Sequence, residues 1–252
     1  MSIKFSTTDS SIVFQEPADL CIANVSGVTL CGWIKATSFP NASNESDIYF
    51  LSTVTGTNFT RAKISIYPNP SSSSGQILMK GRCLDGDTLQ SFSGSSGLVP
   101  VNTWCHIAGL FDYTNKRFIT YFNGAIDATS GVLTLGNAPT SNTASDTEAI
   151  GGEFNGSSAS VKVFNGLIED CRVYNRLLSA GELLTIYNCK GKDNIVYGLK
   201  HKYNLIEGYK GVQISSSSNV IRDYGSLKLN MQQFNEPYWD ISILNHYRRI
   251  YA

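Results

Sequence analysis

The sequence has few charged residues, and their signs balance. Charged side chains make up 16% of the 252 residues, with 20 basic and 20 acidic ones. A nucleic-acid-binding surface needs an excess of positive charge, and a bilayer-spanning helix needs about 20 consecutive apolar residues. The chain has neither, and its first residues lack the apolar stretch of a secretory signal. We therefore expect a folded chain whose partners are neither nucleic acid nor membrane.

Motifs of metal and redox chemistry are also missing. No two cysteines have the Cys-x-x-Cys spacing that zinc and dithiol sites use. Without an export signal, we expect reduced, mostly buried thiols in a protein made in the cytoplasm. The six cysteines are Cys21, Cys31, Cys83, Cys105, Cys171 and Cys189.

Patterns of hydrolytic catalysis are likewise not found. The three histidines (His106, His201 and His246) are scattered and suggest no nucleophile–base arrangement. Retaining glycosidases need two carboxylates about 5–5.5 Å apart. Glu169 and Asp170 are adjacent, so on a strand they would point to opposite faces. We therefore predict that the protein is not an enzyme.

The two charge signs lie on different parts of the chain. Residues 1–188 hold 11 basic and 15 acidic side chains (net −4), and residues 189–252 hold 9 and 5 (net +4). This distribution favours either docking of the two parts on each other or attachment of the second part to something acidic. Docking is the simpler interpretation.

The dominant pattern in the first 175 residues is an alternation of apolar and polar residues. It is broken about every ten residues by Gly, Asn, Ser or Pro, and in one example Ala62, Ile64 and Ile66 share a face opposite Lys63. Such alternation is typical of half-buried strands. The predicted fold class is all-β, an antiparallel two-sheet β-sandwich with one short helix near 179–188 and a C-terminal extension.

Residues 103–129 predict a three-strand meander. Strands are expected at 104–112, 116–122 and 125–128. The dipeptide Asn123-Gly124 between the last two best tolerates the positive φ angles of a type I′ hairpin turn.

One segment has clear helix signals. Ser179 and Glu182 have the spacing of a capping box. Leu183, Ile186 and Tyr187 then share one helical face. We expect a helix of two to three turns that lies on the sandwich.

Three segments together resemble a known family. Residues 30–35 contain a Trp and a Lys at the spacing of one signature strand. Residues 103–112 and 121–124 resemble its "W-x-H-hydrophobic-A … Y-x-N/D-G" signature, and residues 150–152 with 164–183 its closing "F-x-G-x-I-D-x-x-R" segment. The chain thus resembles laminin-G-like, concanavalin-A-like jelly-roll domains over about residues 1–188, the first of two predicted units.

The resemblance implies structural roles for several of these residues. Trp33 and Trp104 would anchor the hydrophobic interior between the sheets. Asp170 and Arg172 would pin strand ends by polar pairing.

Residues 189–252 form the second predicted unit, a C-terminal extension or anchoring segment. Parts of it resemble segments that precede the sandwich in many such domains, and it is similar to C-terminal segments of phage particle proteins. It either completes this chain's own sandwich or docks on a neighbouring subunit. As an anchor it would use aromatic and arginine side chains, which are enriched at interface centres. These partner-binding candidates are Tyr203, Tyr224, Tyr238, Trp239, Tyr247, Arg248 and Arg249.

We expect no cofactor, but the resemblance leaves a calcium site open. Laminin-G-like domains often bind calcium through acidic loops, and calcium prefers oxygen ligands. The acidic candidates are Asp85, Asp87, Asp146 and Glu148. The alternative, which we favour, is that they are turn formers and solvated rim charges.

The resemblance favours a non-enzymatic virion structural protein, a phage capsid decoration or fibre-associated subunit made in the host cytoplasm. Its partners would be other virion proteins such as the capsid shell, further copies of itself, and surface glycans. The alternative is a carbohydrate-binding, lectin-like module used for adhesion. Its candidate aromatic contacts are Tyr49, Tyr67, Phe92 and Tyr113. A glycoside hydrolase ranks third, because the carboxylate pair is missing.

Overall fold

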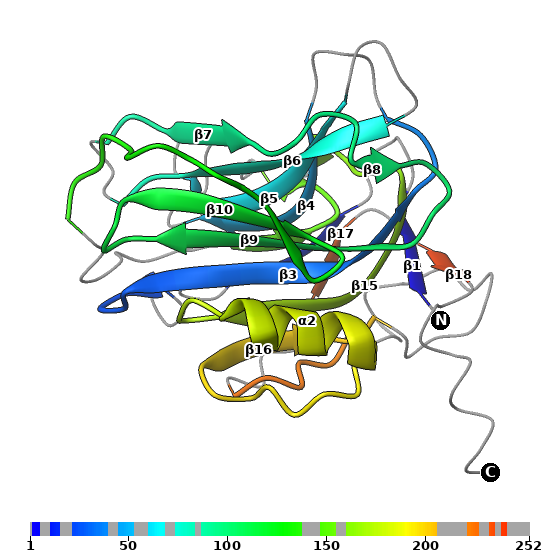
Figure 1. The fold of residues 1–252 in the computed structure, drawn as a ribbon. Helices are drawn as coiled ribbons and strands as arrows, with labels where there is room; N and C mark the ends of the chain where they lie inside the picture. Colours follow the sequence, from blue (N-terminus) through cyan, green and yellow to red (C-terminus); the bar gives the residue numbers. More distant parts are fainter. Residues whose placement is uncertain are drawn as a thin grey trace.

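Two antiparallel sheets stack face to face, with a single described α-helix on the outside of one of them (Figure 1). This computed structural model describes residues 2–5, 11–15, 22–39, 45–52, 60–68, 74–83, 87–137, 147–154, 160–205, 221–226, 232–234 and 238–240. The predicted two-sheet sandwich is thus confirmed.

Sheet A has the strand order β11-β10-β9-β3-β15-β1-β18, and β16 pairs with β15 beside this path. Its strands are β1 (Ser2–Phe5), β3 (Gly27–Ala36), β9 (Cys105–Asp112), β10 (Arg117–Phe122), β11 (Ala125–Thr129), β15 (Gly166–Tyr174), β16 (Leu199–Tyr203) and β18 (Tyr238–Asp240).

Sheet B has the order β17-β2-β12-β4-β5-β6-β7, and β8 pairs with β6. Its strands are β2 (Ser11–Gln15), β4 (Ser46–Ser52), β5 (Thr60–Pro68), β6 (Ser74–Gly81), β7 (Gln90–Ser93), β8 (Val99–Pro100), β12 (Thr147–Ile150) and β17 (Gln232–Phe234). A separate short pair, β13 (Glu153–Phe154) and β14 (Ser160–Val161), follows β12 in the chain.

The main core lies between the inner faces of the two sheets. Ala62, Ile64 and Ile66 of β5 belong to it, as the alternation predicts, and Lys63 lies on the opposite, outer face. Fully burying one such aliphatic side chain contributes roughly 1.5–3 kcal/mol. Period-two alternation therefore selects which face of each strand points inward.

The predicted meander is β9, β10 and β11. β10 pairs antiparallel with both neighbours. Asn123 and Gly124 have φ values of 50° and 80° at the second turn, which is the conformation expected of the dipeptide.

Helix α2 (Ala180–Cys189) covers part of the outer face of sheet A. Ser179 accepts a hydrogen bond from the Glu182 backbone, and both halves of the predicted capping box are present. Leu183 and Ile186 are buried against the sheet. No helix among the described residues is long and apolar enough to cross a membrane.

Trp33 lies under this helix, not between the sheets as we expected. Its ring stacks on Tyr187 of α2, with centroids 5.5 Å apart, and Trp104 is only half-buried. Alternation separates the two faces of a strand, but β3 is buried on both faces because α2 covers the outer one. The tryptophan therefore packs between sheet A and α2, where its ring also lies 5.4 Å from that of His106.

The part of the chain after residue 188 joins both sheets. β16 pairs with β15, β18 with β1, and β17 with β2. Tyr203, Leu205 and Ile221 are buried in the main core. Of the two alternatives for this segment, the described residues show pairing within the chain's own sandwich, so residue 188 does not separate two cores.

The described cysteines are free thiols. Cys31, Cys83, Cys105 and Cys171 are buried, and Cys189 is exposed. Burial raises the pKa of Cys31 to about 12 and that of Cys83 to about 11. Such protonated thiols are poor nucleophiles. Cys21 lies outside the described residues.

Candidate functional site

An exposed aromatic side chain marks the loop that joins α2 to β16. Tyr197 is 80% exposed and its neighbour Val196 is 67% exposed. A large apolar side chain in this position gains nothing for the fold by burial. We call residues 190–198, which contain both, the platform loop.

Backbone conformation turns the chain sharply at both ends of the platform loop. Lys190 ends α2 in the left-handed region with φ 47° and donates its N–H to the Ile186 carbonyl. Gly198 has φ 74°, and a Cβ there would lie 3.0 Å from the Arg176 side chain. Glycine suits this position on both grounds.

The middle of the platform loop is pinned to the outer face of sheet A. Asp193 accepts two hydrogen bonds of 2.8 Å from Arg172, a fully buried residue of β15. Arg172 also grips Asp170, at 2.9 and 2.6 Å, which confirms the predicted Asp170–Arg172 pairing. Tyr174 donates its hydroxyl to the Ile195 carbonyl at 2.8 Å.

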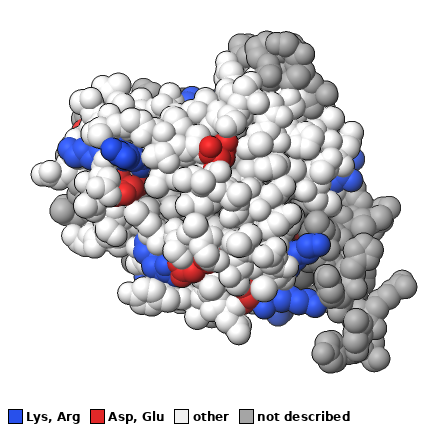
Figure 2. Space-filling view, in the orientation of Figure 1, with Lys and Arg blue, Asp and Glu red and all other residues white. Residues whose placement is uncertain are grey.

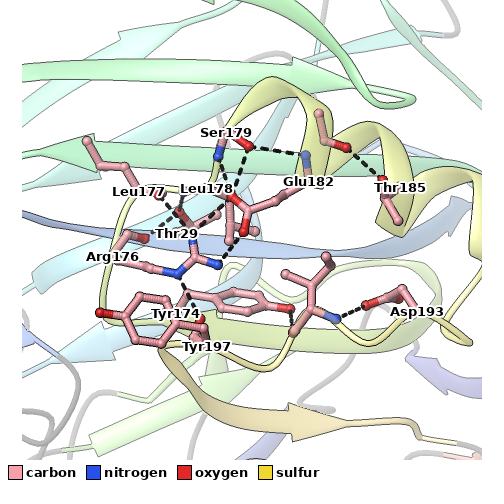
Figure 3. Close-up of polar contacts among 12 residues, drawn as sticks. Thr29, Tyr174, Arg176, Leu177, Leu178, Ser179, Glu182, Thr185, Asp193 and Tyr197 are labelled. Atoms are coloured by element: carbon pink, nitrogen blue, oxygen red, sulfur yellow. Dashed lines mark hydrogen bonds and ion pairs between the residues drawn. The ribbon is translucent and has the colours of Figure 1, made fainter.

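Arg176 supports Tyr197 from the side of the protein. Its Nε donates to the Tyr197 carbonyl at 2.7 Å, and its guanidinium lies 5.2 Å from the ring centroid of Tyr197 and 5.9 Å from that of Tyr174. Cation–π contacts at this range are attractive. Figure 3 shows Arg176 reaching from the two rings to Glu182 in the first turn of α2.

The loop therefore presents Tyr197 in a fixed orientation. Glu182 holds Arg176 and the helix N-cap at once, because it also accepts from the Ser179 backbone. Hydrogen bonds from Arg176 outweigh the effect of burial and lower the pKa of Glu182 to about 2, so this anchor is ionised at neutral pH. A rigid ring loses little conformational entropy when it binds a ligand.

A second charged group lies on the outer face of sheet B. Lys63 Nζ lies 2.8 Å from Glu45, 3.1 Å from Asp47 and 3.1 Å from Glu153. The ammonium of Lys162 contacts Glu153 at 2.6 Å and Glu45 at 2.9 Å. We call these five residues the Lys63 cluster.

The carboxyl groups of the Lys63 cluster have shifted pKa values. Burial raises the pKa of Asp47 to about 6 despite the nearby Lys63. For Glu45, the attraction of Lys63 outweighs burial and lowers the pKa to about 2. Carboxyls with such opposite shifts also occur in acid–base catalysis. Here each carboxylate is bound to Lys63 and at most 5% exposed, so a substrate has no access.

The same cluster does not fit a metal ion. The oxygens of Glu45, Asp47 and Glu153 lie within 4.8 Å of one another, and calcium prefers such ligands. The Lys63 ammonium contacts all three, however. It supplies the positive charge that a cation would bring.

Most of the chain matches a known protein family. Residues 6–184 match the sequence model of the concanavalin A-like lectin/glucanases superfamily. The chain belongs to this superfamily. No curated protein sequence is significantly similar to the chain.

Solved structures of similar fold include several lectin-like members. A putative carbohydrate binding protein from Bacteroides ovatus has a TM-score of 0.63 at 19% identity, over 93% of this chain and 58% of that one. The SAP-like pentraxin from Limulus polyphemus has a TM-score of 0.56 at 18% identity, over 75% and 82%. The CBM40 of the Ruminococcus gnavus IT-sialidase has a TM-score of 0.55 at 22% identity, over 74% and 96%. Identities this low show a shared fold.

The platform loop follows the part of the chain that matches the superfamily. The match ends at residue 184, and Tyr197 lies beyond it. The loop therefore lies outside the residues matched by the superfamily model.

Of the predicted calcium ligands, the two that the structure describes, Asp87 and Glu148, have different hydrogen-bond partners. Glu148 is buried in the core, where Tyr49 donates to it at 3.0 Å and His201 lies 3.4 Å away. Asp87 instead accepts backbone N–H groups of residues 83 and 136, which ties two loops together. Asp85 and Asp146 lie outside the described residues.

Only part of the predicted partner-binding set is described. Tyr203 is buried in the core, which makes it unavailable to a partner. Tyr224 is 41% exposed. The side chains of Tyr238 and Trp239, and all of Tyr247, Arg248 and Arg249, lie outside the described residues, so for them partner binding stays a prediction.

The predicted aromatic sugar contacts are mostly unsuitable. Tyr49 and Tyr113 are buried, and Tyr67 and Phe92 are half-buried. Sequence reasoning missed Tyr197 because its exposure depends on contacts distant in sequence. The one local signal is the pair of glycines, Gly191 and Gly198, that bracket the loop.

Proposed function

We propose that this chain is a non-enzymatic glycan-binding module that uses Tyr197 as its aromatic contact. The observation that carries the proposal is an 80% exposed ring on a pinned loop, supported from below by Arg176. Membership in a superfamily of lectins and glucanases supports it, as does the fold similarity to a carbohydrate binding protein.

The physical basis is a rigid, amphipathic ring beside polar groups. Tyrosine offers large contact area at low entropic cost, and its ring face suits the apolar C–H face of a sugar. Asn194, an exposed residue of the same loop, and the Tyr197 hydroxyl offer hydrogen bonds to sugar hydroxyls.

The surface supports this class of ligand over a nucleic acid. On the face shown in Figure 2, charged side chains lie in separate spots with no continuous patch of one sign. Phosphate binding depends on such a basic patch. Hydrolysis is not part of the proposal, because the carboxylates of the Lys63 cluster are buried.

Glycan-array screening followed by calorimetry tests the proposal. The array includes lactose and α2,6-sialyllactose, the ligand in one structure of the R. gnavus CBM40 (TM-score 0.51). For the best ligand, Tyr197→Ala is expected to weaken binding roughly tenfold or more. Tyr197→Trp retains the aromatic face and should retain binding.

The matched control is Val196→Ala, which shortens another exposed apolar side chain (67% exposed) of the same loop. It should change affinity by less than about twofold, as expected of surface changes outside a contact. Equal binding by the wild type and Tyr197→Ala would overturn the role of Tyr197. An array without any bound glycan would overturn the function itself.

The virion role implied by the family resemblance stays a prediction, as does a location on a particle. It is compatible with glycan binding, since a module displayed on a particle can bind host-surface glycans. Co-sedimentation of the purified chain with assembled particles that lack it would test attachment independently of glycan binding.

A further inference from the structure

We infer that the surface around Tyr197 selects glycans that carry carboxylate groups, with Lys200 as the anion contact and Tyr224 as a second aromatic contact. This inference rests on the proposed function and narrows its ligand class. It follows from which charges near the platform loop are already neutralised and which are not.

The acidic groups around the platform loop are engaged by cations of the fold. Arg172 binds Asp170 and Asp193, Lys202 lies 3.8 Å from Asp170, and Arg176 binds Glu182. These carboxylates would otherwise repel an anionic ligand, but pairing cancels most of their field.

The acidic group on the far side of β16 is also buried. Asp223 lies 2.9 Å from His201 Nδ1 and accepts backbone N–H groups of Lys202 and Gly225. Hydrogen bonds to these groups outweigh burial and lower its pKa. Its charge is therefore held inside the protein, away from the platform loop's solvent side.

Apart from Lys202, which lies near Asp170, the lysines of the same segment are at least partly exposed. Residues 189–205 contain four lysines and one acidic residue, Asp193. Lys192 is exposed, and Lys190 and Lys200 are half-exposed. Within the described part of the chain, Lys190 and Lys200 have no carboxylate within ion-pair distance. The segment that carries Tyr197 therefore has a net positive charge.

Along β16, Lys200 lies between Tyr197 and the position beside which Tyr224 runs. It follows Tyr197 by three residues at the start of β16. Tyr224 donates its backbone N–H to the Lys202 carbonyl at 2.7 Å, and Ser226 donates to Leu199 at 3.4 Å. Residues 224–226 thus run beside β16, whose stretch from 199 to 202 is about 10 Å long. We therefore expect an oligosaccharide that contacts both rings to pass along this stretch of β16 and meet Lys200.

A surface lysine of this kind contributes selectivity more than affinity. Exposed ion pairs are weak because water and salt screen them, so a carboxylate on the ligand should strengthen binding roughly two- to fivefold. The stacking on Tyr197 is shared by neutral and acidic sugars. Charge preference and glycan binding are therefore separable in one experiment.

The test compares hexagalacturonate with its methyl ester, which has the same sugar rings without the charge. We expect the wild-type chain to bind the acid roughly two- to fivefold more tightly at low salt, with the preference lost near 0.5 M salt. Lys200→Gln should abolish the preference and leave binding of the ester unchanged. The matched control is Lys4→Gln, an exposed lysine of β1, which should keep the preference.

Equal binding of acid and ester, or tighter binding of the ester, would overturn the inference while the proposed function stands. So would a preference that survives in Lys200→Gln. If neither hexasaccharide binds, the inference fails. The glycan array then decides separately whether the proposed function fails with it. Tyr224→Ala should weaken both ligands, and an unchanged affinity would remove Tyr224 from the contact surface.

Discussion

Each outer face of the sandwich has a buried cation that binds several carboxylates, but the two arrangements have different consequences. On sheet B, the buried Lys63 contacts three carboxylates, and all of them are buried. On sheet A, the buried Arg172 holds Asp170 and Asp193, and the loop that carries Asp193 then turns Val196 and Tyr197 outward.

The difference shows that a buried cation can either bind acidic groups that are inaccessible to a ligand or hold a loop whose other residues are exposed. Around Lys63, the acidic groups are at most 5% exposed and leave no side chain for a ligand. Around Arg172, the pinned residues alternate with exposed ones along the platform loop. The second arrangement produces a preorganised binding surface, and this distinguishes the face we assign to glycans.

Removal of either buried cation is expected to have the largest effect on stability. Arg172→Met removes the guanidinium that binds the buried Asp170 and Asp193, and Lys63→Met removes the ammonium that contacts three buried carboxylates. Each is expected to lower the free energy of unfolding by about 3–5 kcal/mol, measured by denaturant titration. Only Arg172→Met should also weaken glycan binding under conditions where both variants are folded.

If Arg172→Met does not fold, Arg172→Lys keeps the charge but loses the two-pronged grip on Asp193. It should still loosen the platform loop and reduce glycan affinity. Reduced affinity in Lys63→Met of the same size, or unchanged affinity in Arg172→Lys, would contradict the assignment of the binding face.

Local sequence patterns predicted the framework of both faces, but not their function. The alternation in β5, the Asn123-Gly124 turn and the Ser179 capping box depend on neighbouring residues, and each is present in the structure. The Lys63 cluster joins residues far apart in sequence, such as Glu45 and Glu153. Such contacts depend on the three-dimensional packing of the strands, so the alternation of apolar and polar residues does not predict them.

A smaller difference between the two faces is expected in how a group on each sheet changes stability with pH. Burial raises the pKa of Asp47 on sheet B from 3.8 to about 6. The folded state therefore binds this proton more readily, and stability rises as pH falls from 6 toward 4. Burial lowers the pKa of His106, under α2 on sheet A, from 6.5 to about 4. Here the unfolded state binds the proton first, and stability falls over the same range.

The two contributions oppose each other in the wild type, each on the order of 3 kcal/mol across its window. Asp47→Asn should therefore make the loss of stability toward pH 4 steeper, and His106→Leu should make stability rise toward pH 4. Free energies of unfolding at several pH values between 4 and 7 measure both. Parallel pH curves for the wild type and either variant would show that the corresponding group does not titrate as described.

The most direct test of the central claim is a glycan titration followed by NMR of 13C-labelled tyrosine rings. Tyr197 reports on the platform loop, and Tyr67 of β5 reports on the outer face of sheet B, on the same side of its strand as Lys63. We predict that the Tyr197 ring signal, assigned with Tyr197→Phe, shifts in step with binding while that of Tyr67 stays fixed. A shift of Tyr67 with an unmoved Tyr197 would contradict the account.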